Sequence, residues 1–164
     1  MTEDEWWACR NPDLMVPLIP VERYQRELRR FATACVCRIW HLLPEASRSA
    51  VEASERFAVG EIDEAELGKL IVEAMEVSEA AFPGHSAPDA LAYATSAAAD
   101  ASSVWPRTAS NVLASTSCAA SAAGCAAGEA VTDESEYDAA CESEMREELA
   151  VQASLLRGLV EFPG

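Results

Sequence analysis

The chain has 164 residues, half of them hydrophobic, which is enough for one domain with a buried core. Its formal net charge is −16, because 28 acidic residues stand against 12 basic ones. Such acidity disfavours nucleic acids and anionic membranes as partners. The acidic first residues lack the basic and apolar regions of a secretory signal, so we expect a cytoplasmic protein with six reduced cysteines.

The composition predicts an all-α protein. Alanine supplies much of the apolar content, and Val, Ile and Thr never form an alternating run of strand length. We expect a single domain over residues 1–164, built as a bundle of about six or seven helices. Residues 1–84 form a motif-bearing half, and residues 85–164 form an alanine-rich and acidic half.

The charge is distributed unevenly between two parts of the chain. Residues 1–58 carry eight arginines and nine acids, a net charge of −1, whereas residues 59–164 carry nineteen acids and four cations, a net charge of −15. This asymmetry predicts either that the two parts attract each other or that the acidic part meets a basic partner.

The first elements follow from local signals. Thr2 and Glu5 form a capping box, which predicts a short helix from Glu3 to about Arg10. Asn11-Pro12-Asp13 predicts a turn, followed by a short apolar segment over 14–19.

A long central helix is predicted over residues 20–43. Pro20 suits the first helical position, and Pro44 ends the segment. Apolar residues recur at spacings of three and four, which gives one continuous face: Val21, Tyr24, Leu28, Phe31, Cys35, Ile39 and Leu42.

Four further helices are predicted between Pro44 and about residue 127. The first covers 45–59 and stops at Gly60; Asp63 and Glu66 cap the next, which ends at 82–84. The apolar face of that helix is expected to comprise Leu67, Leu70, Ile71, Ala74, Met75 and Val77. Two more helices are expected over 88–104 and 108–127. Residues 94–128 are mostly Ala, Ser and Thr, so these helices either form a closely packed hairpin, which we favour, or a partly mobile low-complexity region. The uncharged run 108–128 has too few large apolar residues to span a membrane.

The last helix is predicted from about 133 to 159. One line of side chains is expected to face the core: Tyr137, Cys141, Met145, Leu149, Gln152 and Leu156. Cys118, Cys125 and Cys141 are expected to be buried reduced thiols.

Cys37 and His41 are candidate metal ligands, because residues four apart share one face of a helix. A metal- or redox-responsive protein using Cys35, Cys37 and His41 is therefore the alternative function. A structural zinc site needs four ligands, and no Cys-x-x-Cys motif occurs. We expect instead that Cys35 belongs to the core and that His41 bonds a carbonyl, with no metal and no cofactor.

No catalytic motif stands out. Phosphate-binding glycine loops and serine or metalloprotease motifs do not occur. Cys37, next to Arg38 and close to His41, is the single candidate nucleophile. We expect a protein that is not an enzyme.

Arg23, Arg26 and Arg30, with Arg29 offset, form a basic stripe beside the apolar face of the central helix. An anion or nucleic-acid site is one interpretation. Because the chain is so acidic, we favour salt bridges from this stripe to the acidic run 129–148.

Trp6 and Trp7 are also candidate partner contacts. Adjacent residues on a helix point in different directions, so one tryptophan enters the core and the exposed one suits a binding hot spot. The alternative, which we favour, is that the first helix lies flat and buries both partly. Trp40 and Trp105 are expected to anchor the core.

Several segments together resemble a set of uncharacterised bacterial proteins that occur as many paralogues. They are Glu5-Trp6 with Asn11-Pro12, the run from Arg26 to Cys35, Arg38-Ile39-Trp40-His41-Leu42-Leu43, residues 47–60 and the closing 152–157. The relatives carry adjacent cysteines and two arginines before Ile-Trp-His, where this chain has Val36 and Cys37. The resemblance implies a shared helical fold and no activity. We therefore expect a protein-interaction or regulatory module with a protein partner.

Overall fold

The computed structural model describes residues 1–81, 89–102 and 109–163, and within these the chain is all-α. The elements, in chain order, are α1 (Glu3–Ala8), η1 (Pro12–Leu14), η2 (Val16–Leu18), α2 (Val21–Arg38), η3 (Trp40–Leu42), α3 (Glu45–Ala58), α4 (Glu64–Ala81), α5 (Ala90–Ser102), α6 (Ala109–Ala130), η4 (Glu134–Glu136) and α7 (Tyr137–Leu159), where η marks a 3₁₀ turn. The predicted helical bundle is thus confirmed.

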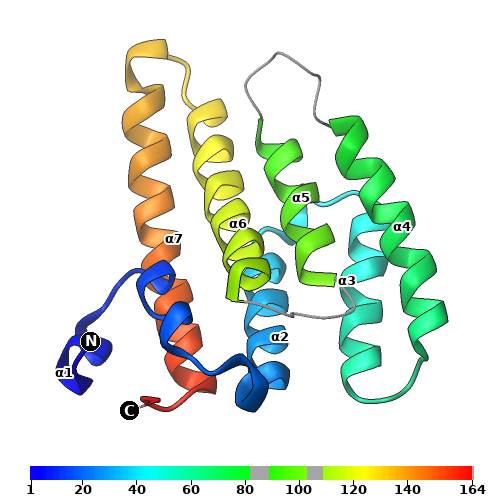
Figure 1. Cartoon of the computed structure of the whole chain (residues 1–164). Helices are drawn as coiled ribbons and strands as arrows, with labels where there is room; N and C mark the ends of the chain where they lie inside the picture. The colour runs from blue at the N-terminus through cyan, green and yellow to red at the C-terminus, as the bar shows by residue number, and fades with distance from the viewer. Residues whose placement is uncertain (82–88, 103–108, 164) are drawn as a thin grey trace.

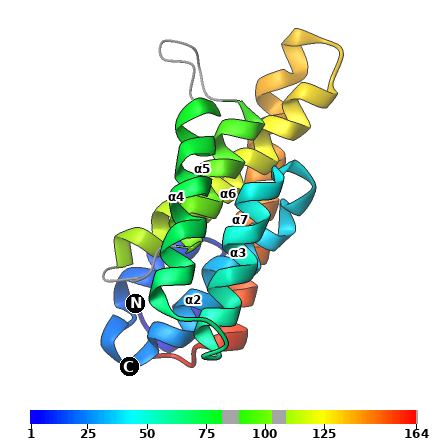
Figure 2. The same cartoon turned by 90° about the vertical axis from the view of Figure 1, so that its right-hand side faces the viewer.

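The helices form two layers. Helices α4, α5, α6 and α7 lie side by side in a row, and α2 and α3 pack behind it (Figures 1 and 2). Helix α2 runs antiparallel to α7, so the beginning of α2 lies near the end of α7 (Figure 1). The side chains of these two segments therefore share one surface of the molecule.

The main core surrounds α2, the helix with the clearest apolar face. Leu28, Phe31 and Cys35 are completely buried, and Ile39 is nearly so. The helix itself ends at Arg38, not at 43 as the sequence predicts, and Tyr24 has non-helical backbone angles. After α2 the chain passes through a 3₁₀ turn. It then becomes extended at Leu43, because a residue before proline disfavours the helical backbone.

The N-terminal segment packs against the end of α7. The predicted capping box of α1 is present, with Thr2 and Glu5 each bonding the other's backbone. Trp6 is completely buried, and its ring lies 6.1 Å from that of Phe162. The Arg157 guanidinium donates to the backbone oxygens of Trp6 and Cys9, at 3.3 and 2.6 Å.

Small residues let the helices of the alanine-rich part approach closely. Ser115 on α6 donates to the backbone oxygen of Ala97 on α5 at 3.0 Å, which ties the two helices together. A Cβ on Gly124 of α6 would lie 2.8 Å from the backbone oxygen of Cys141 on α7. Within the described residues, 94–102 and 109–128 thus form packed helices. The expected helix limits at 82–84, Pro88, Val104 and Thr108, and the expected role of Trp105, lie outside those residues.

Helix α4 lies at the edge of the bundle and has a small core of its own. Ile62, Leu67 and Ile71 cluster with Ala53 of α3, and Asp63 caps the helix by accepting from the Glu66 amide at 2.8 Å. Met75 was expected to face this core, but it is 48% exposed. In the part of the chain with described positions, no helix is long and apolar enough to cross a membrane.

The predicted inner line of α7 is buried only along its second half. Gln152 and Leu156 are completely buried, whereas Tyr137 and Met145 are exposed. Helix α2 covers the C-terminal half of α7, and the N-terminal half lies mainly along α6 (Figure 1). The expectation was wrong for the first half because fewer helices surround it.

Candidate functional site

Cys37 and His41 do not share a face, contrary to the expectation from their spacing. Because α2 ends at Arg38, the two residues belong to different elements. Cys37 lies near the carboxylates of Glu52 and Glu55 on α3. His41 lines a hollow with Glu144 and Glu148 of α7, and Cys37 is not among the lining residues.

The thiols of α2 are poorly suited to nucleophilic or metal chemistry. Burial, Glu148 and Cys37 raise the pKa of Cys35, against the effect of Arg38. Burial, with a smaller effect of Glu55 and Glu52, also raises the pKa of Cys37. Among the described residues, no three His, Cys, Asp or Glu side chains gather closely enough to hold a metal ion. The metal and redox alternative therefore gains no support from the geometry.

The arginines of α2 divide into two groups. Arg29 is buried, donates to the Ser54 hydroxyl of α3 at 3.0 Å and lies over the Phe57 ring, so it is not part of the surface stripe. Arg23, Arg26 and Arg30, which we call the arginine stripe, are exposed. Among the described residues, none of these three arginines lies within 4.0 Å of a carboxylate.

Within the described part of the acidic run, the expected salt bridges to the stripe are therefore not formed. One cation further along α2 does reach that run: Arg38 donates through Nε to both carboxylate oxygens of Glu148 at 2.8 Å. Because α2 and α7 are antiparallel, Glu144 and Glu148 near the middle of α7 lie beside the end of α2, whereas the stripe lies at its beginning. Glu148 is only 3% exposed and also faces the Gln152 amide at 3.4 Å.

A groove lies between α2 and α7, next to the arginine stripe. It encloses about 490 Å³ and is lined by Arg30, Ala34, Glu55, Val151, Ser154, Leu155, Gly158 and Leu159. Val151, Leu155 and Leu159 follow one another at intervals of four, so they form a continuous aliphatic wall along α7. Arg26, Arg30 and Ala34 lie along one face of α2, so the stripe extends the opposite lip. Arg23 lies beyond the break in the helix at Tyr24, with its guanidinium 5.2 Å from the Tyr24 ring. We call this surface the α2–α7 groove.

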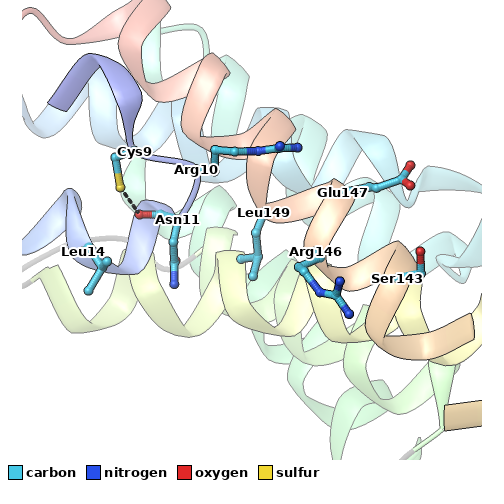
Figure 3. A pocket seen from close by; sticks show the side chains of 8 residues that line it. All are labelled: Cys9, Arg10, Asn11, Leu14, Ser143, Arg146, Glu147 and Leu149. Atoms are coloured by element: carbon cyan, nitrogen blue, oxygen red, sulfur yellow. Dashed lines mark hydrogen bonds between the residues drawn. The ribbon is translucent and has the colours of Figure 1, made fainter. Parts of the chain in front are cut away.

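A second hollow, the N-terminal cleft, lies on another side of α7. It also encloses about 490 Å³, between the N-terminal segment and α7, and is lined by Cys9, Arg10, Asn11, Leu14, Ser143, Arg146, Glu147 and Leu149. Figure 3 shows Arg10 approaching from the N-terminal segment, and Arg146 and Leu149 from α7. The Cys9 thiol donates to the Asn11 backbone oxygen at 3.2 Å.

The α2–α7 groove has the stronger binding chemistry of the two. In the cleft, Arg146 already lies 3.6 Å from Glu142, and the aliphatic lining is Leu14 and Leu149. In the groove, a longer aliphatic wall lies beside arginines that form no ion pair within 4.0 Å among the described residues, and Glu55 is the one acid in the lining. An apolar centre with a charged edge is typical of a protein-binding surface.

The two N-terminal tryptophans are separated by burial. Trp6 is completely enclosed, so it is not a surface contact, and Trp7 is 54% exposed on the other face of α1. The expectation that both are partly buried was wrong, because α1 packs against the bundle only with the face that carries Trp6. Trp40 is half-buried, with the Arg48 guanidinium 5.7 Å above its ring.

Comparison with known proteins adds no relative: no family model, no curated protein and no solved structure matches this chain. The resemblance described from the sequence motifs therefore stays a prediction. The geometry of the chain itself carries the functional argument.

Proposed function

We propose that this chain is a protein-interaction module whose α2–α7 groove binds an acidic, amphipathic helical segment of a partner protein. The observation that carries the proposal is the arginine stripe, three exposed guanidinium groups without an ion pair to any described residue. They lie beside an aliphatic wall in a chain that holds 28 acids and 12 cations. With so many carboxylates available, a row of arginines that forms no ion pair with the described residues favours a negatively charged partner.

The shape of the groove supports a helix as the bound element. Val151, Leu155 and Leu159 repeat every four residues, which matches the spacing of apolar side chains on one face of a helix. The half-buried Ala34 and the exposed Gly158 keep the groove open. A bound helix would place its apolar face on the wall and its carboxylates against Arg26 and Arg30.

Fluorescence anisotropy with a labelled helical peptide tests this proposal. The peptide has 18 residues, the length of α2, with leucines on one face and glutamates on both sides of that face. We expect saturable binding, weakened at least about tenfold by Arg26→Glu/Arg30→Glu, since each lost contact becomes a repulsion. The matched control, Arg10→Glu/Arg146→Glu, reverses two exposed arginines in the N-terminal cleft and leaves the affinity unchanged.

A labelled DNA duplex serves as the competing class of ligand. DNA binding that falls steeply with salt and is abolished by Arg26→Glu/Arg30→Glu would overturn the proposal in favour of a nucleic-acid site. Peptide binding that is equal in wild type and in Arg26→Glu/Arg30→Glu would also overturn it.

A further inference from the structure

The outer face of α4 carries apolar side chains that are left uncovered. Val72 and Met75 are 55% and 48% exposed, and they lie three residues apart on one face. Ala65 is exposed along the same line, and a Cβ added to Gly68 would meet nothing within 4 Å. Helix α4 packs mainly against α3 and α5, through Leu67, Ile71 and Ala74 on its other side.

This face is also strongly acidic. Helix α4 carries one lysine, Lys69, and five glutamates. The glutamates are all exposed: Glu64, Glu66, Glu73, Glu76 and Glu79. Glu76 and Glu79 lie one turn from Val72 and Met75. The outer face of α4 thus has the two properties that the α2–α7 groove selects, exposed apolar side chains in a helical row and carboxylates beside them.

Resting on the proposed function, we infer that the segment bound in the α2–α7 groove is helix α4 of a second copy of this chain. The two surfaces complement each other in charge, since Glu76 and Glu79 lie beside Val72 and Met75, and Arg26 and Arg30 lie beside the aliphatic wall. Glu66 of α4 lies 3.6 Å from Arg56 and is not counted, and Glu55 is the one acid in the groove lining. They also match in length, because the wall from Val151 to Leu159 and the row from Ala65 to Met75 extend about 12 and 15 Å along their helices. Val72 and Met75 would pack on the wall of Val151, Leu155 and Leu159.

The position of the two surfaces makes this contact intermolecular and head-to-tail. Helix α4 and helix α7, which forms one wall of the groove, lie at opposite ends of the four-helix row (Figure 1). A chain therefore cannot place α4 in its own groove. A contact between two different surfaces leaves one groove and one α4 free in each pair, so assembly continues into a ring or a filament.

Sedimentation of the full chain in 0.15 M salt, which screens the repulsion between acidic chains beyond about 8 Å, tests the inference. We expect the mass-average molecular mass to rise with protein concentration above that of one chain. Arg26→Glu/Arg30→Glu and Val72→Glu/Met75→Glu should each keep the chain monomeric. All four side chains are exposed, so both variants should fold, which circular dichroism checks.

Mixing the two variants gives the sharpest result. The first retains α4 and the second retains the groove, so an equimolar mixture should form a one-to-one pair and nothing larger. The control Leu14→Glu/Val59→Glu alters two equally exposed apolar residues outside both surfaces and should assemble like the wild type.

A wild-type chain that stays monomeric at every concentration overturns this inference, and so does a mixture that fails to pair. If the designed acidic peptide still binds and still depends on Arg26 and Arg30, the proposed function stands and only the second copy is excluded. If the peptide does not bind either, the proposed function falls as well.

Discussion

At the scale of single residues, the ion pair between Arg38 and Glu148 illustrates how a buried carboxylate depends on one cation. Arg38 is 41% exposed, whereas Glu148 is 3% exposed. Replacing Arg38 by Met leaves a buried carboxylate that keeps, among the described residues, the hydrogen bond from the Gln152 amide at 3.4 Å. We expect Arg38→Met to lower the free energy of unfolding by about 2 kcal/mol, less than for a fully enclosed pair because water reaches Arg38. Urea denaturation measures it.

The control is Arg146→Met, which removes an exposed pair with Glu142 and should change the free energy of unfolding by less than about 0.5 kcal/mol. Adding Glu148→Gln to Arg38→Met should recover part of the loss, since the buried group is then neutral. Equal losses at positions 38 and 146 would show that the Glu148 carboxylate is not held by Arg38.

Asp100 on α5 gives the molecule a predictable pH dependence. Burial raises the pKa of its carboxyl above the ordinary value. A carboxyl whose pKa is higher in the folded chain stabilises the fold fully below its unfolded pKa, about 3.9, and this contribution is lost as pH rises through the folded pKa. The ionised form therefore destabilises the protein at neutral pH.

Asp100→Asn should accordingly raise the melting temperature at pH 7. The corresponding gain in the free energy of unfolding is about 0.5 kcal/mol, a small value because the site is partly open to solvent. The gain should shrink as pH is lowered towards 4. Thermal melts of Asp138→Asn, at an exposed position on α7, provide the reference. A destabilised Asp100→Asn at pH 7 would mean that the carboxylate has a stabilising partner.

At the scale of helices, the packing of α6 on α7 depends on glycine. The Cβ of alanine at position 124 would lie 2.8 Å from the backbone oxygen of Cys141 and 3.3 Å from the Met145 Cβ. A backbone oxygen cannot rotate away, so the helices must separate. Gly124→Ala should lower the free energy of unfolding by about 1–3 kcal/mol, measured by urea denaturation.

Gly68→Ala is the matched control, because it lies inside a helix and its added Cβ meets nothing within 4 Å. It should raise the free energy of unfolding by about 0.4–1 kcal/mol by restricting the unfolded chain. Both measurements use dilute protein, so that self-association does not contribute to the free energy of unfolding. If both substitutions stabilise the chain, the close approach of α6 and α7 is not needed.

The sequence predicts these elements well where strong local signals exist. The Thr2–Glu5 capping box and the apolar periodicity of α2 identify real helices. The end of α2 is missed because the periodicity continues through Leu42, although Leu43 before Pro44 already favours an extended backbone. Met75 and Met145 are misplaced because periodicity alone does not say how many neighbours a helix has.

At the scale of the whole molecule, only half of the candidate site is readable from the sequence. The arginine stripe is visible because its members lie within eight positions on one helix. Its aliphatic neighbours, Val151 to Leu159, come from the other end of the chain, and only the tertiary packing of α7 on α2 brings them together. The spacing of Cys37 and His41 suggested a site because residues four apart are neighbours on a helix. The structure separates them into two elements, because α2 ends at Arg38.

The central claim is that the α2–α7 groove binds an acidic amphipathic helix, and NMR titration of the ¹⁵N-labelled chain with the designed peptide tests it most directly. We predict amide shift changes concentrated at residues 26–34 and 151–159, with none at the N-terminal cleft. Changes centred on residues 9–14 and 143–149, or no changes at any peptide concentration, would contradict the claim.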